Sequence, residues 1–317
     1  MTAAAGFAVR LVPGRTPLAE FTGEPGGCRD AIRDALSEHG AVLVRGLDIT
    51  GPSQLAGVAG QLGIELMVER EGFAARTELG HGVYSASQWP SSEAMCMHHE
   101  MSYARVVPGV LLFACARASA QGGTTGVADA SAVLAELPGE LVARVERDGW
   151  QVTRAYRSSI GLSWHQAFGT DRPDDVAAYA DREGIVVEWD GDELRTRQRR
   201  PGIVTHPVTG ARCWFNQLAF LNEQTLDAEV RDYLTAEFGP AGLPFNTHYG
   251  DGSPVAVDTV AGINEVYDRH TRREPWQTGD LLLVDNIRTA HSREPYRGDR
   301  EVLVALGEPT DSDQLEG

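Results

Sequence analysis

The segment from Met97 to Tyr103 contains residue types that can hold a metal ion. His98 and Glu100 are two residues apart, and side chains at this spacing in a β-strand point from the same face. An imidazole and a carboxylate placed in this way can bind one ion. Far downstream, His291 lies on another hydrophobic run and could supply a third ligand. Two histidines and one carboxylate form the facial triad of Fe(II) oxygenases, which leaves coordination positions open for a co-substrate and O₂.

Two other histidines compete for these roles. His99 is followed two residues later by Met101 and not by a carboxylate, so we assign it a structural role. His206 is a rival third ligand, but the adjacent Pro207 favours a turn there. A lone His-X-Glu pattern is weak evidence of a metal site. The stronger argument is that a carboxylate inside an apolar strand is costly to bury unless it is paired or binds a metal.

Arg300 is a candidate for binding an anionic ligand of the metal. It follows His291 by nine residues, and a turn at Pro295–Gly298 separates the two. The chain is therefore expected to return beside the histidine. Arginine is the preferred bidentate partner of a carboxylate. Thr125 follows a Gly-Gly-Thr turn sequence, and on its own this pattern is equally typical of an ordinary turn.

Composition excludes several classes of function. All 28 basic residues are arginine, so Schiff-base chemistry and Walker A phosphate binding are excluded. A net charge of −17 argues against nucleic acid and anionic membranes as partners. The four cysteines are widely spaced without a CxxC pair, so we expect buried thiols and neither a zinc site nor a disulfide framework. No apolar run of about 18 residues and no signal-like start are present, so we expect a cytoplasmic protein.

The pattern of short apolar runs favours a mainly β fold with flanking helices. Helices are predicted over residues 28–40, 53–62, 173–182, 225–237 and 254–270, and another is predicted with Ser131 as its cap and a break at Pro138. Strands are predicted over residues 41–44, 94–103, 110–118, 150–156, 185–189, 194–197, 213–217, 280–284, 287–291 and 301–306. Without βαβ alternation, these strands predict a double-sheet jelly roll with a helical insert. We expect a single domain over residues 1–317, with residues 1–20 and 309–317 peripheral or frayed.

Residues 69–92 are rich in Gly, Ser and Pro and lose periodicity, which is typical of an ordered loop that could cover a site. Its polar residues Ser87 and Gln88 are candidates for substrate contacts. Asn216, with its neighbour Gln217, is a further polar candidate, although each of these groups could equally be structural. Arg157 and Arg293 are possible partners for a substrate carboxylate.

Four segments stand in the order seen in TauD/TfdA-like, clavaminate-synthase-like dioxygenases, and the chain resembles that family from about Ala31 to Leu306. The segments are His98-His99-Glu100-Met101-Ser102-Tyr103, Gly122-Gly123-Thr124-Thr125, His206-Pro207 with Trp214-Phe215-Asn216-Gln217, and Asp285-Asn286 leading to His291-Ser292-Arg293-Glu294-Pro295 and Gly298-Asp299-Arg300. The resemblance is closest to the SyrP-type subgroup, which acts on amino acids or carrier-bound intermediates in specialised metabolism. It implies a double-stranded β-helix of the jelly-roll type.

The resemblance also implies a cofactor and roles for the candidate residues. Fe(II) would be bound by His98, Glu100 and His291, and the distal carboxylate of 2-oxoglutarate by Arg300 and Thr125. Glu in place of the more common Asp is the variant of the clavaminate and amino-acid hydroxylase branch. The stretch between His291 and Arg300 is shorter than in several members of the family, which leaves Arg293 as an alternative anchor for 2-oxoglutarate. We prefer Arg300.

The expected activity is hydroxylation of an unactivated C–H bond in a small-molecule substrate. The resemblance implies an amino acid or an amino-acid-derived intermediate, either free or tethered to a carrier protein. Desaturation, epoxidation and cyclisation use the same machinery and stay open. Halogenation is disfavoured, because related halogenases lack the carboxylate ligand that Glu100 supplies. The competing hypotheses are a non-catalytic cupin-like binding protein and a zinc hydrolase; no further carboxylate that could act as general base for the hydrolase is evident.

Overall fold

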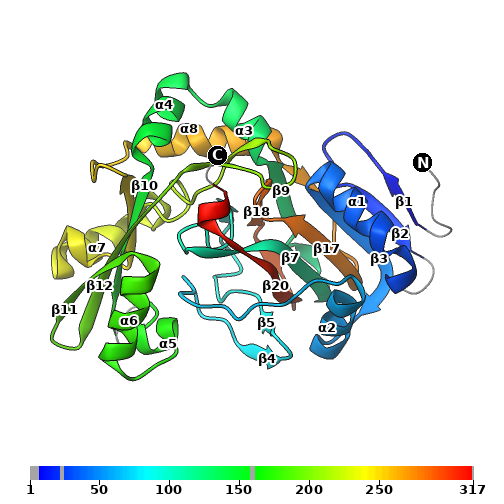
Figure 1. Ribbon diagram of the computed structural model, residues 1–317, viewed down its shortest axis with the longest axis horizontal. Helices are drawn as coiled ribbons and strands as arrows, with labels where there is room; N and C mark the ends of the chain where they lie inside the picture. Colours follow the sequence, from blue (N-terminus) through cyan, green and yellow to red (C-terminus); the bar gives the residue numbers. More distant parts are fainter. Residues whose placement is uncertain (1–6, 22–24, 158–160, 316–317) are drawn as a thin grey trace.

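Two β-sheets pack against each other in the computed structural model, which describes residues 7–21, 25–157 and 161–315 (Figure 1). The larger sheet has eight strands in the order β1-β2-β3-β17-β7-β20-β5-β4, and the smaller one has the order β16-β9-β18-β6. The larger sheet consists of β1 Phe7–Arg10, β2 Leu18–Phe21, β3 Ala41–Ile49, β17 Gly279–Asp285, β7 Val106–Arg117, β20 Glu301–Asp311, β5 Val83–Ser85 and β4 Glu78–Gly80. The smaller sheet consists of β16 Arg272–Arg273, β9 Thr125–Asp129, β18 Thr289–Arg293 and β6 Met95–His98. This arrangement confirms the predicted jelly-roll architecture.

Strand β17 shows why the apolar runs form the centre of the larger sheet. Every residue of β17 is buried, because its two faces contact two different hydrophobic layers. Leu282 and Val284 pack in the layer between the sheets. Leu281 and Leu283 pack on the other side, under helices α1 (Arg29–His39) and α2 (Pro52–Gln61). Burial on both faces is what a continuous apolar run predicts.

A second region lies beside the jelly roll, on the left of Figure 1. Its sheet has the strand order β11-β12-β10-β15. The strands are β10 Trp150–Tyr156, β11 Ile185–Asp190, β12 Glu193–Arg200 and β15 Phe245–Tyr249. Its helices are α5 Trp164–Phe168, α6 Pro173–Glu183 and α7 Ala228–Phe238. Three other helices cover the jelly roll and connect it to this region: α3 Ala130–Glu136, α4 Gly139–Asp148 and α8 Val257–His270. The short pairs are β13 Ile203–Thr205 with β14 Arg212–Trp214 and β8 Gln121–Gly122 with β19 Tyr296–Arg297. The predicted helices and the helical insert are confirmed within a few residues.

Several predicted boundaries are wrong. The strand predicted over residues 94–103 ends at His98, and Met101 in the following turn has a φ of 55°. The predicted strand over residues 213–217 ends at Trp214. The cap of α3 is Asp129, whose carboxylate accepts hydrogen bonds from two backbone N–H groups, in place of Ser131. At α3 the end of the element is set by a local hydrogen bond of the Asp129 carboxylate and not by the apolar pattern.

The structure describes part of both ends, which the sequence predicted to be peripheral or frayed, and the residues described there are ordered in strands. Strand β20 continues to Asp311 by pairing with β7, and Leu315 beyond it is fully buried. Near the start, Leu18 and Ala19 belong to the buried core. Residues 1–6 and 316–317 lie outside the described part, and the prediction of a single domain over residues 1–317 stays a prediction. No helix of the described residues is long and apolar enough to cross a membrane.

Candidate metal centre

Antiparallel pairing of β6 with β18 places His98 directly opposite His291. The two imidazole rings lie 4.2 Å apart between centroids. Together with Glu100 they offer ligand atoms that all lie within 4.8 Å of one another, and all three residues are buried. Residues separated by about three fifths of the chain are thus brought together by one strand pair.

Glu100 reaches this cluster from the turn after β6, so strand alternation is not the reason for its position. Strand β6 ends at His98, so Glu100 lies beyond it. Alternation is also broken within β6. Its register with β18 shifts between Met95 and His98, and these two residues line the same cavity although they are three positions apart. The predicted geometry is therefore wrong, while the predicted proximity of His98 and Glu100 is observed. The turn, with Met101 in the left-handed region, redirects the carboxylate towards the two imidazoles.

The side chain of Asn286 holds the backbone of Glu100 in this turn. Its Oδ1 accepts a hydrogen bond from the Glu100 N–H at 2.8 Å, and its Nδ2 donates to the Glu100 carbonyl at 2.9 Å and to the Pro108 carbonyl at 2.8 Å. Asn286 is completely buried. A turn that leaves a strand loses its ladder partners, and this amide replaces them.

The hydrogen bonds of His98 define which ring nitrogen is available to a ligand. Its Nδ1 lies 2.8 Å from the carbonyl of Cys96, and because a carbonyl only accepts, Nδ1 carries the proton. Nε2 therefore presents its lone pair to the cluster. Phe220 stacks on the ring at 4.2 Å with an interplanar angle of 13°, and Phe73 approaches it edge-on at 6.0 Å. These rings exclude water from one side of the site.

Burial makes both imidazoles poor bases. Desolvation is the largest cause that lowers the pKa of His98, and it lowers the pKa of His291 well below the usual value. The neutral imidazole that results is the form that binds a metal.

Unpartnered buried atoms test whether this cluster fits a metal ion. His98 Nε2 and Glu100 Oε1 are buried and have no hydrogen-bond partner among the described residues. Glu100 Oε2 lies 3.7 Å from His291 Nε2. Such atoms destabilise a protein by about 1–3 kcal/mol each unless something binds them. Two imidazole nitrogens and one carboxylate are a donor set suited to Fe(II), so the cluster fits a divalent metal.

The two competing histidines have structural partners. His99 Nδ1 lies 2.6 Å from the Asn286 carbonyl, and its ring packs against Phe215. His206 Nε2 lies 2.8 Å from Asp285 Oδ2, and its Nδ1 accepts hydrogen bonds from two backbone N–H groups of its own turn. Neither belongs to the cluster of possible metal ligands found in the described residues.

Arg300 lies in the wall of a cavity that also contains His98 and His291. Its Nε donates to the Gly123 carbonyl at 3.1 Å, and no described residue pairs with its two terminal nitrogens. Burial, with a smaller contribution from Arg293, lowers the pKa of Arg300 to about 10, so it remains a cation at neutral pH without a counter-ion. Thr125 lines the same cavity. An anionic ligand would compensate this charge.

Arg293 also borders the cavity, but its guanidinium has other partners. It donates to the carbonyls of Trp89 at 3.2 Å, Pro90 at 2.6 Å and Glu93. These bonds tie the loop before β6 to strand β18. Arg293 therefore has less hydrogen-bonding capacity for a ligand than Arg300.

The candidate substrate residues separate into two groups. Ser87 lines the cavity at His98, and Gln88 lines an adjoining cavity of about 300 Å³ together with Phe73 and Trp89. In contrast, the amide of Asn216 bonds the Gly202 carbonyl and the Leu218 N–H. Asn216 thus binds backbone groups and does not line either of these cavities, and its role in substrate binding stays a prediction that these contacts do not support.

Two more of the polar candidates have structural partners. Gln217 donates to the His99 carbonyl at 2.5 Å. Arg157 pairs with Glu193 at 2.8 Å. Neither side chain lines the cavity that contains His98 or the one that contains Gln88.

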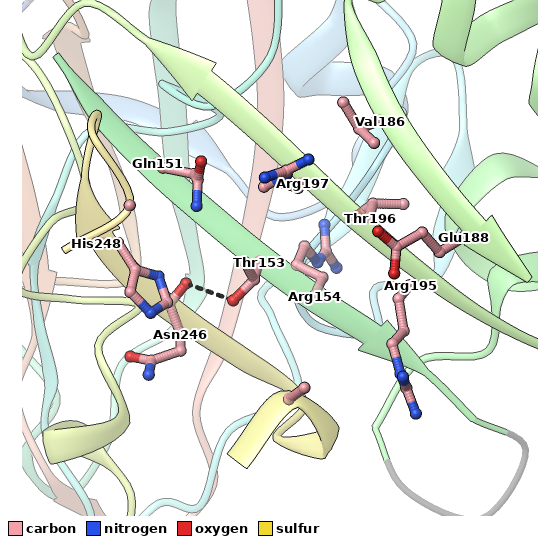
Figure 2. Close-up of a pocket in the computed structure, with 12 residues that line it drawn as sticks. Gln151, Thr153, Arg154, Val186, Glu188, Arg195, Thr196, Arg197, Asn246 and His248 are labelled. Atoms are coloured by element: carbon pink, nitrogen blue, oxygen red, sulfur yellow. Dashed lines mark hydrogen bonds between the residues drawn. The ribbon is translucent and has the colours of Figure 1, made fainter. Parts of the chain in front are cut away.

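Another groove, of about 370 Å³, lies on the outer face of the sheet formed by β10, β11, β12 and β15 (Figure 2). Figure 2 shows Arg197 of β12 near Thr153 of β10, its partner in register, and Arg195 of β12 near Glu188 of β11. Thr153 donates to the Asn246 carbonyl at 3.3 Å. The groove contains none of the three clustered metal-ligand candidates. We therefore place the chemistry at the cavity of the metal cluster.

Arg76 and Asn286 are site residues that the sequence did not indicate as such. Arg76 lies in the irregular segment before β4, and its guanidinium donates to Glu100 Oε2 at 3.0 Å. No spacing pattern links a loop arginine to a carboxylate 24 residues later. The sequence did indicate the Asp-Asn turn before β18. It did not indicate that the side chain of Asn286 contacts Glu100.

Comparison with known proteins matches residues 16–306 to the family "Taurine catabolism dioxygenase TauD, TfdA family". The chain is 35% identical over 279 residues to the dapdiamide synthesis protein DdaC of Enterobacter agglomerans, covering 88% of this chain and 85% of that protein. It is 28% identical over 284 residues to the clavaminate synthase-like protein At3g21360 of Arabidopsis thaliana, covering 86% of this chain and 82% of that protein. The fold is also similar to the structure of PvcB, which is described as an Fe, alpha-ketoglutarate dependent oxygenase from an isonitrile synthetic pathway. The TM-score is 0.56 at 14% identity, and the match covers 97% of this chain and 93% of PvcB.

Proposed function

The chain belongs to the taurine catabolism dioxygenase TauD, TfdA family, and from this premise we propose that it is an Fe(II)- and 2-oxoglutarate-dependent oxygenase that hydroxylates an amino-acid-derived substrate. The observation that supports this most is the buried cluster of His98, Glu100 and His291, whose ligand atoms lie within 4.8 Å of one another. A buried cluster of two imidazoles and one carboxylate with unpartnered atoms is costly unless a metal binds it.

In this proposal His98, Glu100 and His291 hold the Fe(II). Bound iron, with 2-oxoglutarate as co-substrate and O₂ as oxidant, supplies the oxidation of the C–H bond. The residues of the chain contribute position and exclusion. Phe220 fixes the His98 ring by stacking, and the buried surroundings keep both histidines unprotonated.

Arg300 and Thr125 bind the distal carboxylate of 2-oxoglutarate in the proposal. Arg300 is half-buried, and its guanidinium has no carboxylate partner among the described residues. The guanidinium of Arg293, in contrast, donates to three loop carbonyls. A half-buried cation without a counter-ion binds a dianion more strongly than a fully exposed one, because the interaction is screened less.

The proposed substrate is an amino acid or a molecule made from one, and it would lie between Ser87 and the adjoining cavity at Gln88. Phe73, Trp89 and other apolar groups line much of that cavity, so it suits a partly apolar group with a polar end. DdaC belongs to dapdiamide synthesis and PvcB to an isonitrile pathway, and both names are compatible with this class.

The first test measures conversion of 2-oxoglutarate to succinate by the full chain with Fe(II), ascorbate and O₂. A mass-spectrometric screen of free and carrier-loaded amino acids would then look for the addition of one oxygen atom. Absence of both Fe(II) and 2-oxoglutarate binding in calorimetry would refute the oxygenase. Binding of both without any turnover across the screen would instead favour the cupin-like binding protein.

The 2-oxoglutarate anchor is tested by comparing Arg300→Met with Arg293→Met. We expect Arg300→Met to weaken binding of 2-oxoglutarate to the Mn(II)-loaded protein by roughly 100-fold, because a charge-assisted pair stabilises by about 1.5–3 kcal/mol. Arg293→Met should change it by less than about fivefold. Calorimetry measures both, and the reverse order of effects would assign the anchor to Arg293.

A further inference from the structure

Arg76 lies between two carboxylates at the edge of the candidate metal centre. Its side chain is 5% exposed, and those of Glu69 and Glu100 are 10% and 1% exposed. Arg76 and Glu69 both belong to the irregular segment before β4, whereas Glu100 belongs to the turn after β6. One buried guanidinium thus connects the loop segment to the carboxylate of the metal cluster.

All three guanidinium nitrogens of Arg76 have partners. Nη2 donates to Glu100 Oε2 at 3.0 Å, Nη1 to Glu69 Oε1 at 3.1 Å and Nε to Ser87 Oγ at 2.9 Å. Two carboxylates already offset its single positive charge. Although Arg76 lines the cavity, it is therefore a poor anchor for an anionic substrate.

The remaining contacts of Glu100 show what Arg76 adds. Asn286 holds only the backbone of Glu100. Among the described residues, Arg76 makes the one hydrogen bond to its carboxylate, and Oε1 stays without a partner. Without Arg76, rotation of the glutamate side chain would be limited by packing alone.

We propose that Arg76 is a positioning residue that orients the Glu100 carboxylate for the metal and thereby couples metal binding to the placement of residues 69–76 beside the site. The inference rests on the proposed function only in that a divalent metal binds this cluster. Partners of metal ligands commonly contribute in this way, and their loss weakens metal affinity by about 10–100-fold. Loss of Arg76 would also remove the cation that the buried carboxylates of Glu69 and Glu100 share.

Two other roles for Arg76 predict different outcomes. If Arg76 competes with the metal for Glu100 Oε2, its removal should tighten metal binding. If it serves only as the counter-ion of Glu69, removing both charges together should restore normal metal affinity. A set of variants at Arg76 and Glu69 therefore separates the three roles.

The experiment titrates the full metal-free chain with Mn(II) and follows binding by electron paramagnetic resonance, a readout that needs no turnover. We expect Arg76→Gln and the double variant Arg76→Gln with Glu69→Gln to bind Mn(II) at least tenfold more weakly than the wild type. The matched control is Arg45→Gln, which removes a partly buried pair with Asp280 at 3.0 Å outside the cluster. It should leave Mn(II) affinity unchanged.

Hydrogen–deuterium exchange of residues 69–77 gives a second readout, which a purely structural role would not change. In the wild type, Mn(II) should slow exchange in this segment, and in Arg76→Gln that protection should be lost. If Arg76→Gln does not fold, Arg76→Lys, which keeps the charge without the three-way geometry, is tested in the same two assays and should show the same losses.

Unchanged or tighter Mn(II) binding in Arg76→Gln, or full restoration in the double variant, would overturn the inference while leaving the metal site intact. Failure of the wild type itself to bind Mn(II) would instead overturn the proposed function and this inference with it.

Discussion

Asn286→Ala is the substitution for which the structure makes the sharpest prediction. The change removes three buried hydrogen bonds, two to the backbone of Glu100 and one to the Pro108 carbonyl. Each buried polar group left without a partner destabilises by about 1–3 kcal/mol. We therefore expect a loss of about 4 kcal/mol in the free energy of unfolding, a large fraction of the ~5–15 kcal/mol typical of a protein.

The same change should weaken metal binding, because Asn286 positions the turn that carries Glu100. We expect Mn(II) affinity to fall by roughly tenfold or more. Asn216→Ala is the matched control, since that buried asparagine also bonds backbone groups, at Gly202 and Leu218, but away from the cluster. It should destabilise the fold by about 2 kcal/mol and leave Mn(II) affinity unchanged.

Urea unfolding of the metal-free chains measures the first effect, and titration with Mn(II) well below the unfolding transition measures the second. The reasoning fails if Asn286→Ala binds Mn(II) as tightly as the wild type while it loses stability. It also fails if Asn216→Ala weakens binding as much as Asn286→Ala does, because general loosening would then explain both.

Two further predictions concern burial and backbone strain. Burial raises the pKa of the Cys115 and Cys213 thiols to about 11, so the reactive thiolate becomes abundant only as the pH approaches 11. At pH 8, alkylation of these thiols by iodoacetamide should be at least 100-fold slower than alkylation of an ordinary thiol. Mass spectrometry should find both thiols unmodified until denaturant is added; rapid labelling of the folded chain would contradict their burial. Gly122→Ala should lower the free energy of unfolding by about 2 kcal/mol more than Gly14→Ala. Both glycines have a positive φ, but a Cβ at Gly122 would lie 2.2 Å from the Pro295 carbonyl oxygen, whereas a Cβ at Gly14 would have no atom within 4 Å. Thermal unfolding compares the two, and equal losses would show that the Pro295 contact relaxes freely.

The sequence by itself determined the class of fold and the identity of the candidate ligands. Continuous apolar runs such as β17 predict buried strands because only a strand with both faces covered can bury every residue. His98, Glu100 and His291 stood out by residue type and by motif order, which depend on chemistry and not on exact geometry.

Only the tertiary structure decided how these residues meet and which others serve them. Strand alternation was the wrong reason for the position of Glu100, because a left-handed residue at Met101 and the amide of Asn286 place it from a turn. Arg76 could not be identified from spacing, since its contact with Glu100 joins two irregular segments through a buried guanidinium. Long-range hydrogen bonds between loops leave no periodic trace in a sequence, whereas burial of apolar faces does.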